Sequence, residues 1–143
     1  MVLIEQRHPA FGDLIRLWRA RSVDGALPLA SALVPAELAE LADVTVMLAL
    51  ENGGEALVIA ESGDGVDALY GDSLAGCPAA RLSPERDDAE REARTAIETR
   101  RPLLIEDELR EVDRRRRIAR LYLPLAKDDG SPDGVLCGVV PVA

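Results

Sequence analysis

Few residues in this chain of 143 have the chemistry of a metal ligand or a nucleophile. The sequence holds one histidine, His8, and two cysteines, Cys77 and Cys137. A structural zinc site takes four such ligands and a disulfide framework takes several cysteines, so we expect neither, and no metal. We interpret the two cysteines as small packed residues whose thiols stay free in a reducing cytoplasm. We interpret His8 as a solvated residue in an N-terminal leader.

Carboxylates offer another route to chemistry. Glu61, Asp64 and Asp67 lie close together, next to Gly63 and Gly65. A general acid or base must project into an apolar pocket that sets its pKa, whereas this turn-like sequence favours solvated carboxylates. A small enzyme of the ketosteroid-isomerase-like cone fold, which would need such a residue, is kept as the alternative function. A long helix between the second and third strands would exclude that fold.

Arginines concentrate at one place in the sequence. They are Arg114, Arg115, Arg116 and Arg117, with Arg110 and Arg120 nearby. One interpretation is a solvated hairpin turn whose arginines offset the acids Glu106, Asp107, Glu108 and Glu111 across the strands. The other is a docking patch for an acidic partner or a phosphate, since guanidinium groups bind both in bidentate geometry.

Composition limits the class of protein. The net charge is −9, which disfavours a protein that grips nucleic acid or an anionic membrane, because both need concentrated positive potential. Hydrophobic residues make up 48% of the chain and aromatic residues only 3%. We therefore expect one domain with an aliphatic core, which binds neither nucleic acid nor membrane.

The first part of the chain predicts helices. Residues 1–10 are expected to form a flexible leader, and residues 11–42 to hold two helices. In the first, from Phe11 to Arg21, apolar residues that include Phe11, Leu14 and Trp18 recur at helical spacing. This stripe either packs on the chain's own sheet or forms a homodimer seam with Trp18 as anchor. Pro35 opens a second short helix, Ala36 to Leu41.

The rest predicts five strands and one long helix. The expected strands are Val44 to Leu50, Ala56 to Ala60, Leu103 to Val112, Arg117 to Ala126 and Val135 to Val142. Asn52-Gly53 favours a hairpin turn between the first two. Ser83-Pro84-Glu85 is typical of a helix start, and the helix should run to about Arg100. Its apolar face consists of Ala89, Ala93, Ala96 and Ile97. The order of elements indicates an α+β domain.

Several motifs in this order resemble the PAS fold, and specifically the single-domain PAS-like family of alphaproteobacteria. The motifs are Leu17-Trp18 with Gly25-Ala26-Leu27-Pro28, Pro35-Ala36-Glu37-Leu38, Gly65 to Gly71 with Leu74-Ala75-Gly76, Arg101-Pro102, Leu121 to Leu125, and Gly138-Val139-Val140. The most specific is the short helix that ends in Tyr70-Gly71.

The resemblance implies a fold and a function. The core, residues 43–143, should be a five-stranded antiparallel sheet of order 2-1-5-4-3, covered on one face by helices that enclose a small cavity, with an N-terminal helical extension. The implied role is a sensory or protein-interaction module in cytoplasmic signalling, without catalytic residues and dimeric. Its partners would be a second copy, an unidentified signalling protein and a small-molecule ligand.

A ligand cavity would be lined by Tyr70, Tyr122, Ala93 and Ile97. No cofactor is expected. PAS sensors that bind haem use a histidine from the long helix, and the segment from Ser83 to Arg100 has none. Flavin photosensors of the light-oxygen-voltage class place their reactive cysteine in a run with Asn, Arg and Gln, whereas Gly76-Cys77-Pro78-Ala79 offers only the cysteine.

Overall fold

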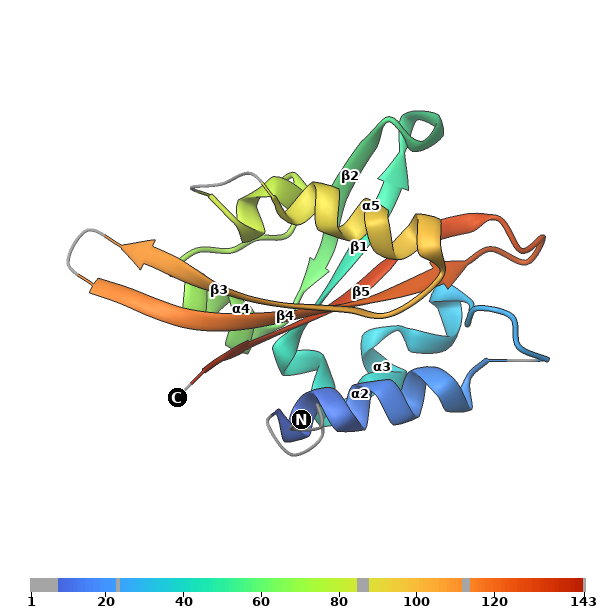
Figure 1. The fold of residues 1–143 in the computed structure, drawn as a ribbon, viewed down its shortest axis with the longest axis horizontal. Coiled ribbons are helices and arrows are strands. Elements are labelled where there is room, and N and C mark those ends of the chain that lie inside the picture. Colours follow the sequence, from blue (N-terminus) through green and yellow to red (C-terminus); the bar gives the residue numbers. More distant parts are fainter. Residues whose placement is uncertain (1–7, 23, 85–87, 112–113, 143) are drawn as a thin grey trace.

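The computed structural model describes residues 8–22, 24–84, 88–111 and 114–142. These residues form a five-stranded sheet of order β2-β1-β5-β4-β3, in which every neighbouring pair is antiparallel. The strands are β1 (Thr45–Glu51), β2 (Ala56–Ser62), β3 (Leu103–Glu111), β4 (Arg114–Ala126) and β5 (Pro132–Pro141). The predicted strand order is confirmed, and Figure 1 shows helices on both sides of the sheet.

One face of the sheet is covered by the segment between β2 and β3. This segment forms α4 (Asp64–Tyr70), the short 3₁₀ helix η4 (Ala79–Leu82) and α5 (Ala89–Thr99). The small residues of α5, Ala89, Ala93 and Ala96, are fully buried in the core on this face. Because alanine side chains are short, α5 lies close against the strands, as its apolar stripe predicts.

The N-terminal extension covers the opposite face. It forms α2 (Pro9–Ala20), η1 (Ala30–Leu33), α3 (Pro35–Leu38) and η2 (Ala39–Val44). In Figure 1, α2 and α3 lie on one side of the sheet and α5 on the other. A second core cluster fills the space between α2 and the strands, so the N-terminal extension covers the face that α4, η4 and α5 leave open.

The apolar stripe of α2 packs on the chain's own sheet. Phe11, Leu14 and Trp18 are buried in this second cluster, and the indole N–H of Trp18 donates a hydrogen bond to the carbonyl oxygen of Pro124, 2.9 Å away. The structure therefore agrees with the interpretation in which this stripe packs on the chain's own sheet. Dimerisation of the chain is a separate matter and stays a prediction.

The expected leader reached too far along the chain. Helix α2 begins at Pro9, and His8 just before it is only 5% exposed. Its Nε2 lies 3.3 Å from a carboxylate oxygen of Glu106 on β3, and its ring packs against Phe11. The prediction of a solvated His8 was therefore wrong, because the ring is covered by Phe11 and lies within reach of the Glu106 carboxylate.

Some predicted boundaries differ from the structure. Helix α5 begins at Ala89 rather than at Ser83, although the Ser83 hydroxyl still accepts a hydrogen bond from the Ala89 N–H, 2.7 Å away. Glu85 lies outside the described residues. The backbone of residues 114–116, expected in a turn, belongs to β4, while Val112 and Asp113 are outside the described residues. Strand β5 starts at Pro132.

The predicted hairpin turn is present. Asn52 and Gly53 have positive φ values of 53° and 69°, which the sequence Asn-Gly tolerates at low cost. The short helix α4 ends, as expected, at Gly71 in the left-handed conformation. Within the described ranges, no helix is both long and apolar enough to cross a bilayer.

Candidate functional site

A buried arginine lies in the centre of the space between α5 and the sheet. Arg120 on β4 is 1% exposed. Its Nη2 lies 2.9 Å from Glu92 Oε1 on α5 and 3.2 Å from Asp107 Oδ2 on β3. We refer to Arg120, Glu92, Asp107 and Tyr122 as the Arg120 cluster. It joins one helix and two strands through a single cation.

Tyr122 and a backbone carbonyl complete the cluster. The Arg120 Nε donates to the Tyr122 hydroxyl at 2.9 Å, and that hydroxyl donates to Glu92 Oε1 at 2.7 Å. Arg120 Nη1 also donates to the carbonyl oxygen of Leu82 in η4, which accepts the Tyr70 hydroxyl as well. Among the described residues, no buried side-chain nitrogen or oxygen lacks a partner. The polar interior is thus fully hydrogen-bonded, as a stable core requires.

Strand and helix periodicity explain why these residues meet. Alternation along β4 directs Ile118, Arg120 and Tyr122 toward α5, while the residues between them face α2. Asp107 pairs with Ile118 across the β3–β4 ladder and so shares that face. Glu92 lies one turn from Ala89 on the buried side of α5. The strand alternation and the helix periodicity can both be seen in the sequence. Arg120 was nevertheless grouped with the arginines at 114–117, and that group was interpreted as a solvated hairpin turn.

The electrostatics favour a charged arginine beside neutral tyrosines. Burial raises the pKa of Tyr122 and of Tyr70 above the ordinary value. Burial opposes the charge on Arg120, but Tyr122 and Glu92 beside it hold its pKa above the ordinary value. The cluster therefore holds one cation between carboxylates, with the phenols as uncharged donors.

All four predicted cavity residues contact the same core. Tyr122 and Ala93 are fully buried there, and Tyr70 and Ile97 pack against it half-buried. The two hydroxyls on which a ligand would depend are already engaged, with Glu92 and with the Leu82 carbonyl. Their role in ligand binding stays a prediction.

The two cysteines lie in different surroundings. Cys77 follows α4 in a loop, where its carbonyl oxygen accepts the N–H of Ile59 on β2. Cys137 is fully buried on β5, and burial raises its pKa to about 12. Neither is near a run of Asn, Arg and Gln, so the residues around them do not fit the flavin site of light-oxygen-voltage domains.

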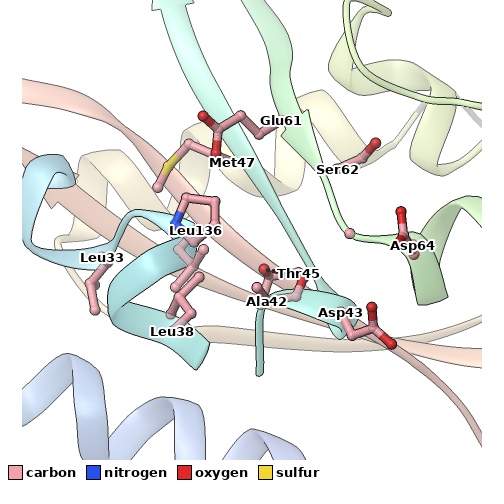
Figure 2. Close-up of a pocket in the computed structure, with 12 residues that line it drawn as sticks. Leu33, Leu38, Ala42, Asp43, Thr45, Met47, Glu61, Ser62, Asp64 and Leu136 are labelled. Carbon is pink, nitrogen blue, oxygen red and sulfur yellow. Dashed lines mark hydrogen bonds between the residues drawn. The ribbon is translucent and has the colours of Figure 1, made fainter. Parts of the chain in front are cut away.

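A groove of about 210 Å³ opens where the N-terminal extension meets the edge of the sheet. We call it the α3–β2 groove. Its apolar floor includes Leu33, Leu38, Met47 and Leu136, and its rim carries Asp43, Glu61 and Asp64. Figure 2 shows the leucines toward one end, with Asp43 and Asp64 toward the other.

One wall of this groove is a close backbone contact. A Cβ added at Gly63 would strike the carbonyl oxygens of Ala42 and Asp43 in η2, and one added at Gly65 would lie 2.7 Å from the carbonyl oxygen of Asp43. The turn that leads into α4 can therefore approach η2 only because both positions are glycine.

The three candidate catalytic carboxylates do not share one site, because Glu61 and Asp64 line the α3–β2 groove and Asp67 does not. Asp67 accepts hydrogen bonds from the Ser62 hydroxyl and the Leu74 N–H, at 2.7 and 3.1 Å, and so holds the turns around α4. Glu61 and Asp64 are exposed at the groove. The long helix α5 lies between β2 and β3, and this order excludes the cone fold.

The backbone of all four predicted docking arginines belongs to β4, where only Arg117 was expected in a strand. Arg115 and Arg117 are exposed and Arg116 is half-buried, whereas only the backbone of residue 114 is described. Arg117 pairs with Glu106 across the strands at 3.4 Å, as the charge-offset interpretation predicts. Docking of a partner by these residues stays a prediction.

The comparisons with known proteins agree with this architecture. No family model matches the sequence, and no curated protein matches it. Solved structures do match. A PAS domain from Colwellia psychrerythraea has a TM-score of 0.55 and 16% identity, over 75% of this chain and 95% of that one.

Two further structures agree with the first. A light-oxygen-voltage domain studied with a flavin analogue has a TM-score of 0.60 and 15% identity, over 80% of this chain and 89% of that one. A sensory box sensor histidine kinase from Vibrio cholerae has a TM-score of 0.51 and 20% identity, over 74% and 90%. The strand order and these likenesses establish that the chain has the PAS fold.

Proposed function

We propose that this chain is a non-catalytic sensory or protein-interaction module of the PAS type, which acts in cytoplasmic signalling as a homodimer. It would belong to the single-domain PAS-like family of alphaproteobacteria. Its output would pass through a partner protein, and its input would be that partner or a small molecule. The observation that carries the proposal is the Arg120 cluster, which connects α5 to β3 and β4 through one buried cation.

Such a connection suits a module with discrete states. Moving α5 away from the sheet would separate Glu92 from Arg120 and leave a buried charge with fewer partners, which is unfavourable. The helix therefore has well-defined packings rather than a continuous range of positions. A ligand or partner that prefers one packing shifts the population toward it.

The similar structures add support. They are a PAS domain, a light-oxygen-voltage domain and a sensor histidine kinase, and the last of these names denotes a sensor. Transfer of that role to this chain rests on the shared fold, so it belongs to the proposal.

Hydrogen exchange of the full chain, with and without the Tyr122 hydroxyl, tests this proposal. Tyr122→Phe removes the hydroxyl that bridges Arg120 and Glu92. We expect amides of α5 to exchange about tenfold faster while those of β1 and β5 change little, because α5 then opens separately. Thr95→Ala, at an exposed position of the same helix, is the matched control and should leave α5 unchanged.

The opposite result is equally clear. Equal protection of α5 and the sheet in both proteins would mean that the helix opens only with global unfolding, and the proposed states would not exist. Native mass spectrometry of the same samples should give the mass of two chains; the mass of one chain would remove the homodimer from the proposal.

A further inference from the structure

The α3–β2 groove combines an apolar floor with an acidic rim. Asp43, Glu61 and Asp64 are exposed around it, and its lining includes no lysine or arginine. Within the described parts of the chain, none of these three carboxylates has an ion-pair or side-chain hydrogen-bond partner. Their negative charge is therefore available to a ligand.

The hydroxyl groups of the groove are already used. Thr45 donates its hydroxyl to the carbonyl oxygen of Ala42 at 3.0 Å, and Ser62 donates to Asp67. The polar side-chain groups left for a ligand are thus negatively charged hydrogen-bond acceptors, so the complementary ligand brings positively charged donors. The floor, which includes Leu38 and Met47, requires an apolar group as well.

The size of the groove favours side chains of a larger partner. Pockets that enclose a drug-sized ligand measure about 300–1,000 Å³, and this groove is smaller, at about 210 Å³. Val34, which lies in the sequence between the lining residues Leu33 and Pro35, is an apolar residue that is 38% exposed. The net charge of −9 would also steer a basic partner toward the protein.

We propose that the α3–β2 groove binds a basic amphipathic segment of a partner protein. An apolar side chain of that segment enters between Leu38 and Met47, and flanking lysines or arginines pair with the rim carboxylates. The groove proposal deepens the proposed function, because it names the chemistry of the partner. It rests on the proposed function in one respect, namely that the partner is a protein. The hydrogen-exchange result on α5 is independent of it.

A random peptide library displayed on phage, selected against the immobilised full chain, tests the proposal without assuming a sequence. Selected peptides should carry Lys or Arg beside Leu, Ile, Phe or Met. The most enriched peptide is then synthesised and its Kd measured by fluorescence anisotropy, at low and high salt. High salt should weaken binding, because exposed charge pairs are screened.

Two variants locate the binding. Neutralising the rim by Asp43→Asn, Glu61→Gln and Asp64→Asn should raise Kd about tenfold. Met47→Lys places a cation inside the groove and should abolish binding, while the half-buried site lets the lysine reach solvent. The control neutralises three exposed acids elsewhere, by Glu51→Gln, Glu55→Gln and Glu98→Gln, and should change Kd less than about twofold. Circular dichroism verifies that each variant is folded.

Several outcomes would overturn the proposal. These are no enriched peptide, enrichment of acidic or neutral peptides, and equal weakening by the two neutralised proteins, which would indicate general charge attraction. A small cation retained by the wild type but not by the Met47→Lys protein in native mass spectrometry would make the groove a small-molecule site. Loss of self-association in that variant would instead make a second copy the occupant.

Discussion

The guanidinium of Arg120 and the carboxylate of Glu92 are 2.9 Å apart, with side chains only 1% and 12% exposed. The first residue lies on β4, an inner strand of the sheet, and the second on α5, the helix that covers it. A pair so buried carries a large desolvation cost, which its partners must offset together. Removing either member therefore has a different effect from removing both.

The stability of the Arg120–Glu92 pair can be measured by a double-mutant cycle. Glu92→Leu should lower the free energy of unfolding by about 3 kcal/mol, because it leaves Arg120 with Asp107 as its remaining carboxylate. Adding Arg120→Leu should restore part of the loss, since no buried cation then remains. Urea denaturation measures both. Additive losses would show that the two side chains are not coupled.

Gly138 on β5 controls the docking of α2. A methyl group there would meet Leu14 and Phe11 at 2.8 Å, so Gly138→Ala should push the helix outward and cost about 1–3 kcal/mol. Trp18 is the only tryptophan in the chain, and its fluorescence should shift to longer wavelength as its ring becomes wetter. Asp13→Ala, on the exposed side of α2, should leave the emission unchanged. Unchanged emission in both proteins would contradict the packing described.

Stability should fall in alkaline solution. Burial raises the pKa of Cys137 to about 12 and holds those of Tyr70 and Tyr122 above their ordinary values. Above about pH 9 the unfolded chain therefore binds fewer protons than the folded one, and the free energy of unfolding decreases as pH rises. The stabilisation that comes from the protonated Cys137 thiol is complete below its ordinary pKa of 9.0. It is lost as the pH rises toward the pKa of about 12 that the thiol has in the folded protein.

Urea denaturation at neutral pH and in steps to about pH 11 measures this dependence. Cys137→Ala removes the thiol, so the free energy of unfolding of this variant should fall less steeply with pH than that of the wild type. Equal slopes for the two proteins would mean that the thiol ionises alike in the folded and unfolded chain. A flat profile for the wild type would contradict the burial of all three groups.

Turn chemistry and apolar periodicity were enough to predict most of the fold. Asn52, Gly53 and Gly71 stand where the backbone has a positive φ, which these residue types adopt at low cost. The alanines of α5 lie on its buried face. The strand order came from the resemblance, because no pattern in a single sequence specifies which distant strands pair. The sequence does not decide the position of α2, since its apolar stripe suits the chain's own sheet and a homodimer seam equally.

The interior of the candidate site was less accessible to sequence reasoning. Arg120 stands near other arginines, and composition alone assigns such a group to the surface. Only the nearly continuous apolar run around Arg120, from Ile118 to Ala126, marks this part of β4 as buried on both faces. The α3–β2 groove could not be predicted, because no local pattern specifies how the segments that line it fold against one another and against Leu136, which is distant in the sequence.

The glycines at 63 and 65 set how movement would travel through the molecule. Side chains between two segments usually absorb a small displacement by changing rotamer. Here the main chain of the turn rests directly on the main chain of η2, and no rotamer intervenes. A shift of the N-terminal layer near Asp43 would therefore press directly on the backbone of the turn that leads into α4.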